Sequence, residues 1–438
     1  MHVELTIEDL APGGEGVGRS GPRAVFIPYT APGDRVNADV PAGEGPAHGS
    51  LLSVLSPGPS RVEPPCRHFG GGAQKADADR ECGGCEWLHV RYEAQLAAKA
   101  RGFEETLRRI GRIDPVAAGL RPILASPLPL RYRARAKFHL DRASGKLAFF
   151  RRRSHAPVRL EECHLLAPGL DALRAAVGPA LVEARLLARE VALEWSEEEG
   201  RGSALLLLDP GGSARARAEA LLAAVPALAG VVLRGEGGPV AAVGAPVLRL
   251  ARVPGRPAAG LQRSRPDVFQ QANRAANALL VEAALALLRP EGEDVLELHC
   301  GAGNFTAPLA ARARAVAAVE AQGPALDLAR EDLAAAGNVR FFAGDALKLA
   351  LALARERGPA ARRFGAVLLD PPREGAKGIG PALRELGSAR AVYVSCDPAT
   401  LARDVRACVE AGFRVAAIQP VDMFPQTHHV EGVVLLER

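Results

Sequence analysis

The stretch DVLELHCGAGNF (residues 294–305) decides the fold of this chain. Its first half is an apolar run suited to a buried strand, and a helix is expected to begin at Asn304. Between them, Gly301 and Gly303 let the backbone turn tightly and approach a ligand. A buried strand that passes through a glycine turn into a helix is typical of the first unit of a doubly wound α/β domain.

The chain on either side of this stretch has the same organisation. From about residue 263 a helical segment leads into strand-like runs that alternate regularly with helices. The runs are DVLELHC, AVAAVE, VRFFAG, FGAVLLD, AVYVSC, FRVAAIQ and GVVLLE. This alternation predicts a Rossmann-like domain over residues 263–438 with a mostly parallel sheet.

Ligands of such sheets bind beyond the carboxyl ends of the strands, where three acids follow predicted strands. Glu320 could accept hydrogen bonds from two ribose hydroxyls, Asp345 could meet an adenine amino group, and Asp370 follows the fourth strand. A glycine pair alone fits nicotinamide and adenosine ligands alike, or a turn without any ligand. The acids and the absence of a GxGxxG motif favour S-adenosylmethionine, whose sulfonium requires no phosphate cradle.

The stretch AVYVSCDPATLARD (391–404) places Cys396 where the fifth strand ends and a helix begins. The positive end of that helix is expected to favour the thiolate, which indicates a nucleophile rather than an inert core residue. A thiolate that adds to carbon 6 of a uracil activates carbon 5 toward a methyl donor, and a base must then remove the carbon 5 proton. Glu431 is the candidate base, with His428 and His429 as alternatives.

The C-terminal half carries several motifs in order: FQQAN, ELHCGAGNFTAPLA, LLDPPREG, VYVSCDPATLARD and MFPQTHHVE. On these motifs the chain resembles the S-adenosylmethionine-dependent RNA 5-methyluridine methyltransferases. The resemblance implies that Cys396 is the nucleophile and Glu431 the general base. It also implies a set of cofactor contacts, which comprises Gln271, His299, Asn304, Glu320, Asp345 and Asp370.

The N-terminal half divides into two further parts. Residues 1–58 read as short strands broken by Gly and Pro, which predicts a small β-barrel, and GGEGVGR and PGDRV resemble a TRAM RNA-binding domain. Residues 61–262 are expected to form an α+β central domain with an RNA-binding surface. Within it, the amphipathic stretch 93–112 predicts a helix that can pack on the catalytic domain.

Cys82 and Cys85 form a Cys-x-x-Cys pair, and with Cys66 upstream and Cys163 downstream they make a metal-binding pattern by count. Four thiolates suit either zinc or a [4Fe–4S] cluster, and spacing does not separate the two. The family resemblance favours the [4Fe–4S] cluster. Cys300 and Cys408 are expected to be structural.

Charge and composition set the remaining expectations. The net charge of +5 permits RNA without requiring it, and basic residues concentrate at 131–137 and 149–159. For 131–137, where Tyr132 stands among arginines, RNA contact through phosphates and base stacking is favoured over a solvated face. An odd cysteine count without a signal-peptide pattern predicts a reducing, cytoplasmic location. No apolar window is long enough to span a membrane, and a monomer is expected.

Together these features predict an enzyme that transfers a methyl group to carbon 5 of a uridine in RNA. The TRAM-plus-cluster organisation favours 23S ribosomal RNA, with transfer RNA as the close alternative. A methyltransferase for proteins or small molecules would leave Cys396 and Glu431 without a role. A non-enzymatic iron–sulfur RNA-binding protein would not bind S-adenosylmethionine.

Overall fold

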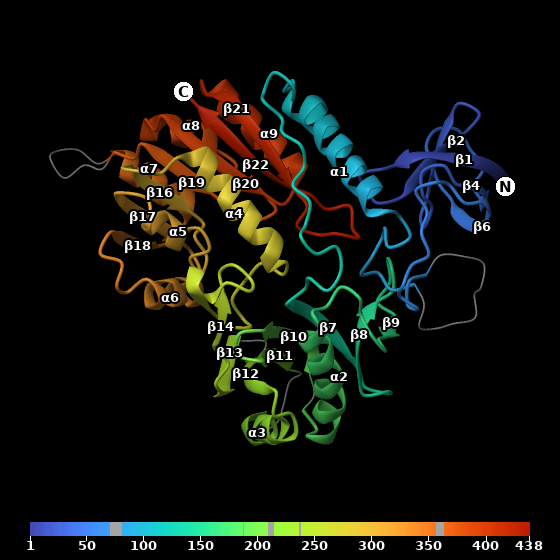
Figure 1. Cartoon of the computed structure of the whole chain (residues 1–438), viewed down its shortest axis with the longest axis horizontal. Coiled ribbons are helices and arrows are strands. Elements are labelled where there is room, and N and C mark those ends of the chain that lie inside the picture. The colour runs from blue at the N-terminus through green and yellow to red at the C-terminus, as the bar shows by residue number, and fades with distance from the viewer. Residues whose placement is uncertain (71–80, 187, 209–213, 236–237, 356–362) are drawn as a thin grey trace.

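The computed structural model describes residues 1–70, 81–186, 188–208, 214–235, 238–355 and 363–438. These residues form three lobes, each built on its own sheet, with the chain termini in two different lobes (Figure 1). The domain boundaries expected from the sequence stay predictions. One long segment of the middle region packs on the C-terminal lobe.

The N-terminal lobe is a small barrel of six strands. They are β1 (His2–Leu10), β2 (Gly16–Ser20), β3 (Arg23–Ile27), β4 (Arg35–Asp39), β5 (Ala47–His48) and β6 (Ser50–Ser56). The strand order is β5-β3-β2-β1-β4-β6, and only Gly49 separates β5 from β6. One nearly continuous segment therefore pairs with both edges of the sheet and closes it, and the enclosed core includes Leu5, Ile7 and Val25.

The middle lobe is an α+β unit with a mixed sheet in the order β13-β12-β11-β10-β7-β8-β9. Its strands are β7 (Arg135–Asp141), β8 (Lys146–Phe150), β9 (Pro157–Arg159), β10 (Ala188–Ser196), β11 (Arg201–Leu208), β12 (Leu228–Gly235) and β13 (Gly238–Gly244). Helices α2 (Pro168–Glu183) and α3 (Ala214–Ala224) pack on this sheet. A hairpin of β14 (Leu248–Ala251) and β15 (Leu261–Ser264), with a 3-10 turn at Pro257–Ala259, leads to the C-terminal lobe.

The C-terminal lobe has the doubly wound sheet that the sequence predicted. Its strands are β16 (Asp294–Leu298), β17 (Ala315–Glu320), β18 (Val339–Ala343), β19 (Ala366–Leu369), β20 (Arg390–Ser395), β21 (Arg414–Val421) and β22 (Glu431–Glu437). The order is β18-β17-β16-β19-β20-β22-β21. The first five strands in this order are parallel, and β22 is antiparallel to both of its neighbours.

Helices cover this sheet and join its strands. They are α4 (Arg274–Leu288), α5 (Thr306–Ala310), α6 (Gly323–Asp332), α7 (Ala346–Arg355), α8 (Ile379–Leu386) and α9 (Pro398–Glu410). Alternating strands and helices bury two apolar layers, one on each face of the sheet. The carboxyl ends of five strands are thereby left together at one edge, free to carry polar groups.

The helix expected over 93–112 is present as α1 (Tyr92–Thr106), continued by a π-helical turn at Leu107–Gly111. It lies beside β22 and α9 of the C-terminal lobe (Figure 1). Phe103 packs so closely on Gly432 that a β-carbon there would come within 2.6 Å of the ring. The chain that follows stays on this lobe, because Leu120 forms an isolated bridge with a residue of the edge strand β21.

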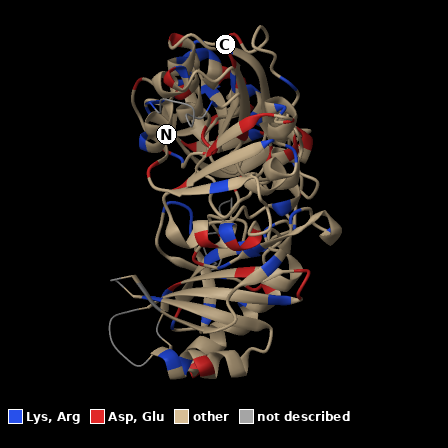
Figure 2. Ribbon diagram, turned by 90° about the vertical axis from the view of Figure 1, so that its left-hand side faces the viewer, with Lys and Arg blue, Asp and Glu red and all other residues tan. Residues whose placement is uncertain are grey.

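Charges of both signs are spread along the whole molecule, in keeping with the small net charge (Figure 2). Among the described residues, no helix is both long and apolar enough to cross a membrane.

Candidate active site

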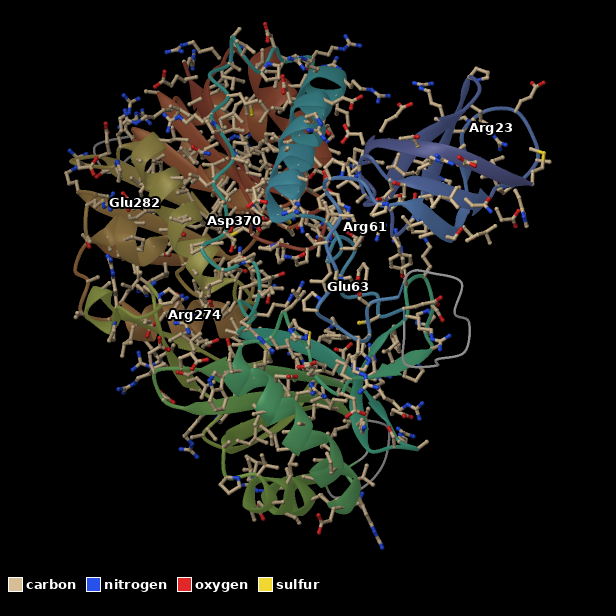
Figure 3. All side chains as sticks on the ribbon, turned by 45° about the vertical axis from the view of Figure 1, so that its right-hand side comes forward. Arg23, Arg61, Glu63, Arg274, Glu282 and Asp370 are labelled. Atoms are coloured by element: carbon tan, nitrogen blue, oxygen red, sulfur yellow. The ribbon has the colours of Figure 1, made fainter. Side chains whose placement is uncertain are left out.

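The carboxyl edge of the C-terminal sheet gathers the predicted site residues. His299, Asp370 and Cys396 directly follow β16, β19 and β20. Glu320 is the last residue of β17, and Asp345 follows β18 by two positions. Because these five strands are parallel, their ends share one edge. Asp370 lies toward the interior of the molecule, where this edge faces the other lobes (Figure 3).

Glu431 reaches the same edge because β22 runs in the opposite direction. Ser395 at the end of β20 pairs with Gly432 near the start of β22. The residues next in register are Cys396 and Glu431, so the antiparallel pairing brings the predicted nucleophile and the predicted base together. The sequence placed both at strand ends, but the pairing of these two strands is what makes them neighbours.

Burial governs the protonation of both groups. Glu431 is 2% exposed, and burial, reinforced by the Asp370 carboxylate and opposed by Arg373, raises its pKa to about 8. The pKa of the Cys396 thiol is also raised, by burial and then by the Glu431 carboxylate, while the Arg373 guanidinium acts on the sulfur to lower it. The expected stabilisation of the thiolate by the helix N-terminus stays a prediction. Burial also raises the pKa of Asp370 to about 7.

Arg373 is a site residue that the sequence reasoning did not single out, although it lies within the quoted LLDPPREG motif. Its loop is fastened to α9, the helix that begins just after Cys396. The Thr400 hydroxyl donates to the Arg373 carbonyl oxygen at 3.0 Å, and the Ala376 amide donates to the Asp404 carboxylate at 2.7 Å. These bonds fasten the backbone of the loop that carries Arg373, whose guanidinium acts on the Cys396 sulfur.

The two rival bases have other surroundings. His428 donates its backbone amide and turns its Nδ1 atom toward the Glu86 carboxylate, at 3.0 and 2.6 Å. His429 lies edge-on to the Phe424 ring, and burial lowers its pKa to about 4. Both imidazoles belong to the loop before β22, whereas Glu431 begins β22 beside the end of β20, which Cys396 directly follows.

The glycine turn after β16 is tied to the acid at the end of β17. The Glu320 carboxylate accepts from the Gly301 amide at 2.9 Å and from the Gln322 amide at 2.8 Å. Gly301 has φ +55° and open space where a β-carbon would be, so the turn presents bare backbone at the strand end. His299, just before it, also has a left-handed φ of +63°.

The other predicted cofactor residues are distributed around this turn. Asn304 exchanges two hydrogen bonds with the side-chain amide of Asn277 on α4, at 2.8 and 3.0 Å. Asp345 is exposed and caps α7 by accepting from the Lys348 amide at 2.8 Å. Gln271 is half-buried in the segment that leads into α4.

A buried acid that the sequence reasoning missed lies in the middle of this edge. Glu297 in β16 is fully buried, and the Thr306 side chain is a polar neighbour that acts to lower the pKa of its carboxyl. Burial, reinforced by Asp370 and Glu320, raises its pKa to about 8. Its signal in the sequence was a charge inside an otherwise apolar strand. Glu297, Glu320 and Asp370 therefore converge on one edge of the sheet. Such a group of acids fits a cationic ligand, and S-adenosylmethionine carries a sulfonium and an ammonium group.

The four predicted metal-binding cysteines line a single cavity of about 90 Å³, whose walls come from residues 66–69, 82–88 and 133–165: Cys66, Cys82, Cys85 and Cys163. Burial raises the pKa of all four thiols, that of Cys82 to about 12, and neighbouring thiols raise the pKa of Cys66, Cys82 and Cys85 further. Within the described ranges, no three His, Cys, Asp or Glu side chains group around a position for a single metal ion.

The basic stretch 131–137 is built into the fold, which corrects its interpretation as an RNA-stacking surface. Tyr132 is 4% exposed, and its hydroxyl donates to the Pro425 carbonyl oxygen at 3.1 Å. The Arg135 guanidinium donates to backbone oxygens within residues 266–268. Tyr132 lies in the segment just before β7, and its contact with Pro425, 293 positions away, could not be read from composition.

The second basic stretch, 149–159, lies between the middle lobe and the barrel. Phe150 stacks on His139 with ring centroids 3.8 Å apart. Arg152 lies 3.8 Å from the Glu15 carboxylate of the barrel. Part of this charge therefore joins two lobes rather than facing solvent.

Comparisons with known proteins agree with this geometry. The family model for tRNA (Uracil-5-)-methyltransferases matches residues 252–438, and the TRAM domain model matches residues 2–45. The chain is 36% identical to the 23S rRNA (uracil(1939)-C(5))-methyltransferase of Pseudomonas putida, with 99% of this chain and 93% of the relative covered. It is 34% identical to the protein of the same name from Thiobacillus denitrificans, with both chains covered completely.

Among solved structures, the chain is similar to the Pyrococcus abyssi tRNA (uracil-54, C5)-methyltransferase in complex with S-adenosyl-L-homocysteine. The TM-score is 0.74 at 21% identity, and 99% of this chain and all of that chain are covered, so the likeness extends to the whole fold. With its N-terminal TRAM barrel, its class I methyltransferase sheet and relatives this similar over their full length, the chain belongs to the family of RNA uracil-C5 methyltransferases.

Proposed function

We propose that this enzyme methylates carbon 5 of a uridine in 23S ribosomal RNA, with Cys396 as nucleophile and Glu431 as general base. The observation that carries the proposal is the register of β20 and β22, which makes these two residues neighbours at the ligand-binding edge of the sheet. The choice of ribosomal RNA rests on the names of the full-length relatives.

The chain's own groups match the demands of the reaction. The Cys396 sulfur would add to carbon 6 of the uracil, and Arg373 opposes the burial that otherwise disfavours the thiolate. Glu431 would then take the proton from carbon 5, and a carboxyl with a pKa of about 8 is a base matched to neutral pH. S-adenosylmethionine, when bound, supplies an electrophilic methyl group.

The residues proposed to hold that cofactor surround the glycine turn: Gln271, His299, Asn304, Glu320, Asp345 and Asp370. Glu320 supports this role because it already fixes the Gly301 amide and keeps lone pairs for ribose hydroxyls. The buried acids at this edge favour a cation over a phosphate-bearing ligand. A thermal-shift titration with S-adenosylmethionine should therefore raise the melting temperature, which a non-enzymatic iron–sulfur RNA-binding protein would not show.

The cavity of four cysteines is proposed to hold a [4Fe–4S] cluster. A single water molecule needs about 10–15 Å³ of cavity volume, so the 90 Å³ cavity has room for a group of several atoms. Buried thiols with raised pKa values stay neutral unless a cationic centre binds them, which suits a cluster or zinc. Broad visible absorbance and iron in anaerobically purified protein are expected, and a colourless, zinc-containing protein would contradict the cluster.

The RNA is proposed to span the barrel and the catalytic edge, with the target uridine extruded from its stack because a stacked ring face is closed to the thiol. The decisive experiment incubates the protein with methyl-labelled donor and total RNA from a strain that lacks the gene. Label at carbon 5 of one 23S uridine is expected, and Cys396→Ala should abolish it. Label confined to transfer RNA would replace the substrate, and label in protein or small molecules would overturn the function.

A further inference from the structure

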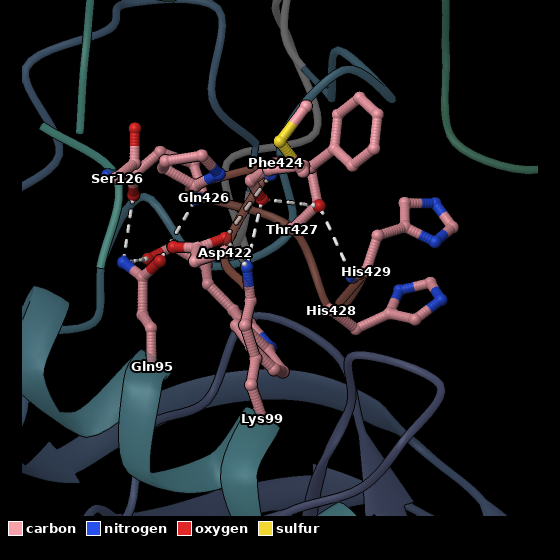
Figure 4. Close-up of polar contacts among 12 residues, drawn as sticks. Gln95, Lys99, Ser126, Asp422, Phe424, Gln426, Thr427, His428 and His429 are labelled. Atoms are coloured by element: carbon pink, nitrogen blue, oxygen red, sulfur yellow. Dashed lines mark hydrogen bonds and ion pairs between the residues drawn. The ribbon is translucent and has the colours of Figure 1, made fainter. Parts of the chain in front are cut away.

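The loop between β21 and β22 joins the two halves of the chain. It starts at Asp422 and ends at Val430, just before the proposed base. Residues far away in the sequence, among them Lys99 and Gln95, hold its start and its middle (Figure 4). At its start, the fully buried Lys99 of α1 donates to Asp422 at 2.5 Å and to the Phe424 carbonyl oxygen at 3.0 Å.

The middle of the loop is held in a conformation that it would not adopt alone. Gln426 has φ +68°, a left-handed backbone that costs energy for a residue other than glycine. Its carbonyl oxygen accepts from the Glu86 and Trp87 amides at 2.9 and 3.1 Å. Its side chain and backbone amide each bond to the Gln95 side-chain amide, at 2.9 and 3.0 Å. These bonds offset the backbone strain.

The end of the loop nearest the base is fastened by one carboxylate. The Glu86 Oε2 atom lies 3.0 Å from the His428 backbone nitrogen and 2.6 Å from its Nδ1 atom. Glu86 directly follows Cys85, which lines the cysteine cavity. The barrel packs against the same carboxylate, because a β-carbon on Gly14 would come within 2.9 Å of it. Glu86 is therefore the point where barrel, cysteine cavity and catalytic loop meet.

We propose that Glu86 is a positioning residue for the release of the methylated uridine, a role that rests on the proposed function. In that step the Glu431 carboxylate takes the proton from carbon 5. The electron pair of that C–H bond forms the C5–C6 double bond, and the C6–S bond breaks with its electrons returning to the Cys396 sulfur. Earlier steps need the thiol and the methyl donor but not this base, so a displaced Glu431 impairs release selectively.

Glu86→Ala removes the anchor at the base end and leaves the Lys99 anchor at the other end in place. Loss of hydrogen bonds to a charged group predicts release slower by about tenfold. The assay is a single turnover with ordinary RNA and methyl-labelled donor, in which label in free RNA is separated from label in a denaturation-resistant protein–RNA adduct. Wild type should show label in free RNA, and Glu431→Gln should show it in the adduct. Glu86→Ala should move label toward the adduct while total label forms at nearly the wild-type rate.

Two controls separate positioning from general damage. Glu86→Gln keeps an acceptor oxygen for His428 and should restore release, and Glu105→Ala, which changes an exposed acid on α1, should behave as wild type. If Glu86→Ala folds poorly, His428→Ala removes only the ring contact, and a smaller shift of label toward the adduct is expected.

The outcomes distinguish this inference from the function beneath it. Label absent from RNA with wild-type protein overturns both. If the wild-type protein labels RNA, but Glu86→Ala slows methyl transfer and release equally or slows neither, the positioning role alone is overturned. A His428→Ala protein that traps more adduct than Glu431→Gln would make His428 the base and would also overturn it.

Discussion

Replacement of the proposed base should make the protein more stable, by an amount that depends on pH. Glu431 has a pKa of about 8 in the folded protein against 4.5 as the ordinary value. Its neutral form supports the fold fully below the ordinary pKa, and that support is lost as the pH rises toward 8, because the unfolded carboxyl ionises first. Glutamine mimics the neutral form at every pH.

The size of the effect follows from this difference. At pH 7, protonation of Glu431 in the folded protein costs about 3 kcal/mol relative to the ionised carboxyl of the unfolded chain. At pH 5 the same cost is about 1 kcal/mol. Glu431→Gln should therefore stabilise the C-terminal lobe by about these amounts and lose turnover.

The measurement is urea-dependent hydrogen exchange of the β22 peptide, which reports on this lobe separately from the other two. Glu437→Gln is the matched control, because it makes the same change at the other end of the same strand, where the carboxylate pairs with Arg289 at 2.6 Å. The control should lose at most about 1 kcal/mol. A Glu431→Gln protein that is no more stable than wild type at pH 7, or whose gain is the same at both pH values, would refute the reasoning.

Three further changes test other contacts. Lys99→Met leaves Asp422 buried without its cation and should lower the free energy of unfolding by about 3–5 kcal/mol, and the double variant with Asp422→Leu should recover most of this loss. Urea unfolding midpoints of the wild type, the two single variants and the double variant measure the coupling. Losses that simply add in the double variant would contradict the pairing. Arg373→Ala removes the cation that acts on Cys396, so adduct formation with 5-fluorouridine RNA should slow by about tenfold and require higher pH; an unshifted pH–rate profile would rule out this role. Glu320→Ala should weaken S-adenosylhomocysteine binding by about tenfold in calorimetry, and unchanged affinity would exclude the carboxylate from the cofactor site.

The fold of the catalytic lobe could be predicted from the sequence because short, neighbouring segments carry its pattern. Alternating strands and helices, together with the glycines after residue 298, indicated a doubly wound sheet, and the strand ends nominated the acids along one edge. Cys396 and Glu431 were found as strand ends too, although their contact depends on the antiparallel β22.

The sequence did not reveal which way side chains point or which residues far apart in the chain come into contact. Tyr132 was expected to stack on RNA but is buried, and the burial that raises the pKa of the Cys396 thiol follows only from the folded chain. Glu86 and His428 stand 342 positions apart, so no local pattern could pair them. Arg373 lay inside a quoted motif, but only the folded loop brings it to the thiol.

The wide separation of the partners that grip the β21–β22 loop also orders biosynthesis. The surface that receives this loop is made from α1 and the segment after Cys85, and the ribosome completes both long before the loop emerges. Until the loop is synthesised, Lys99 lacks its partner Asp422, which lies 323 positions downstream. A polypeptide truncated before β21 would lack Asp422 and would have to bury this ammonium without its carboxylate or leave it in water.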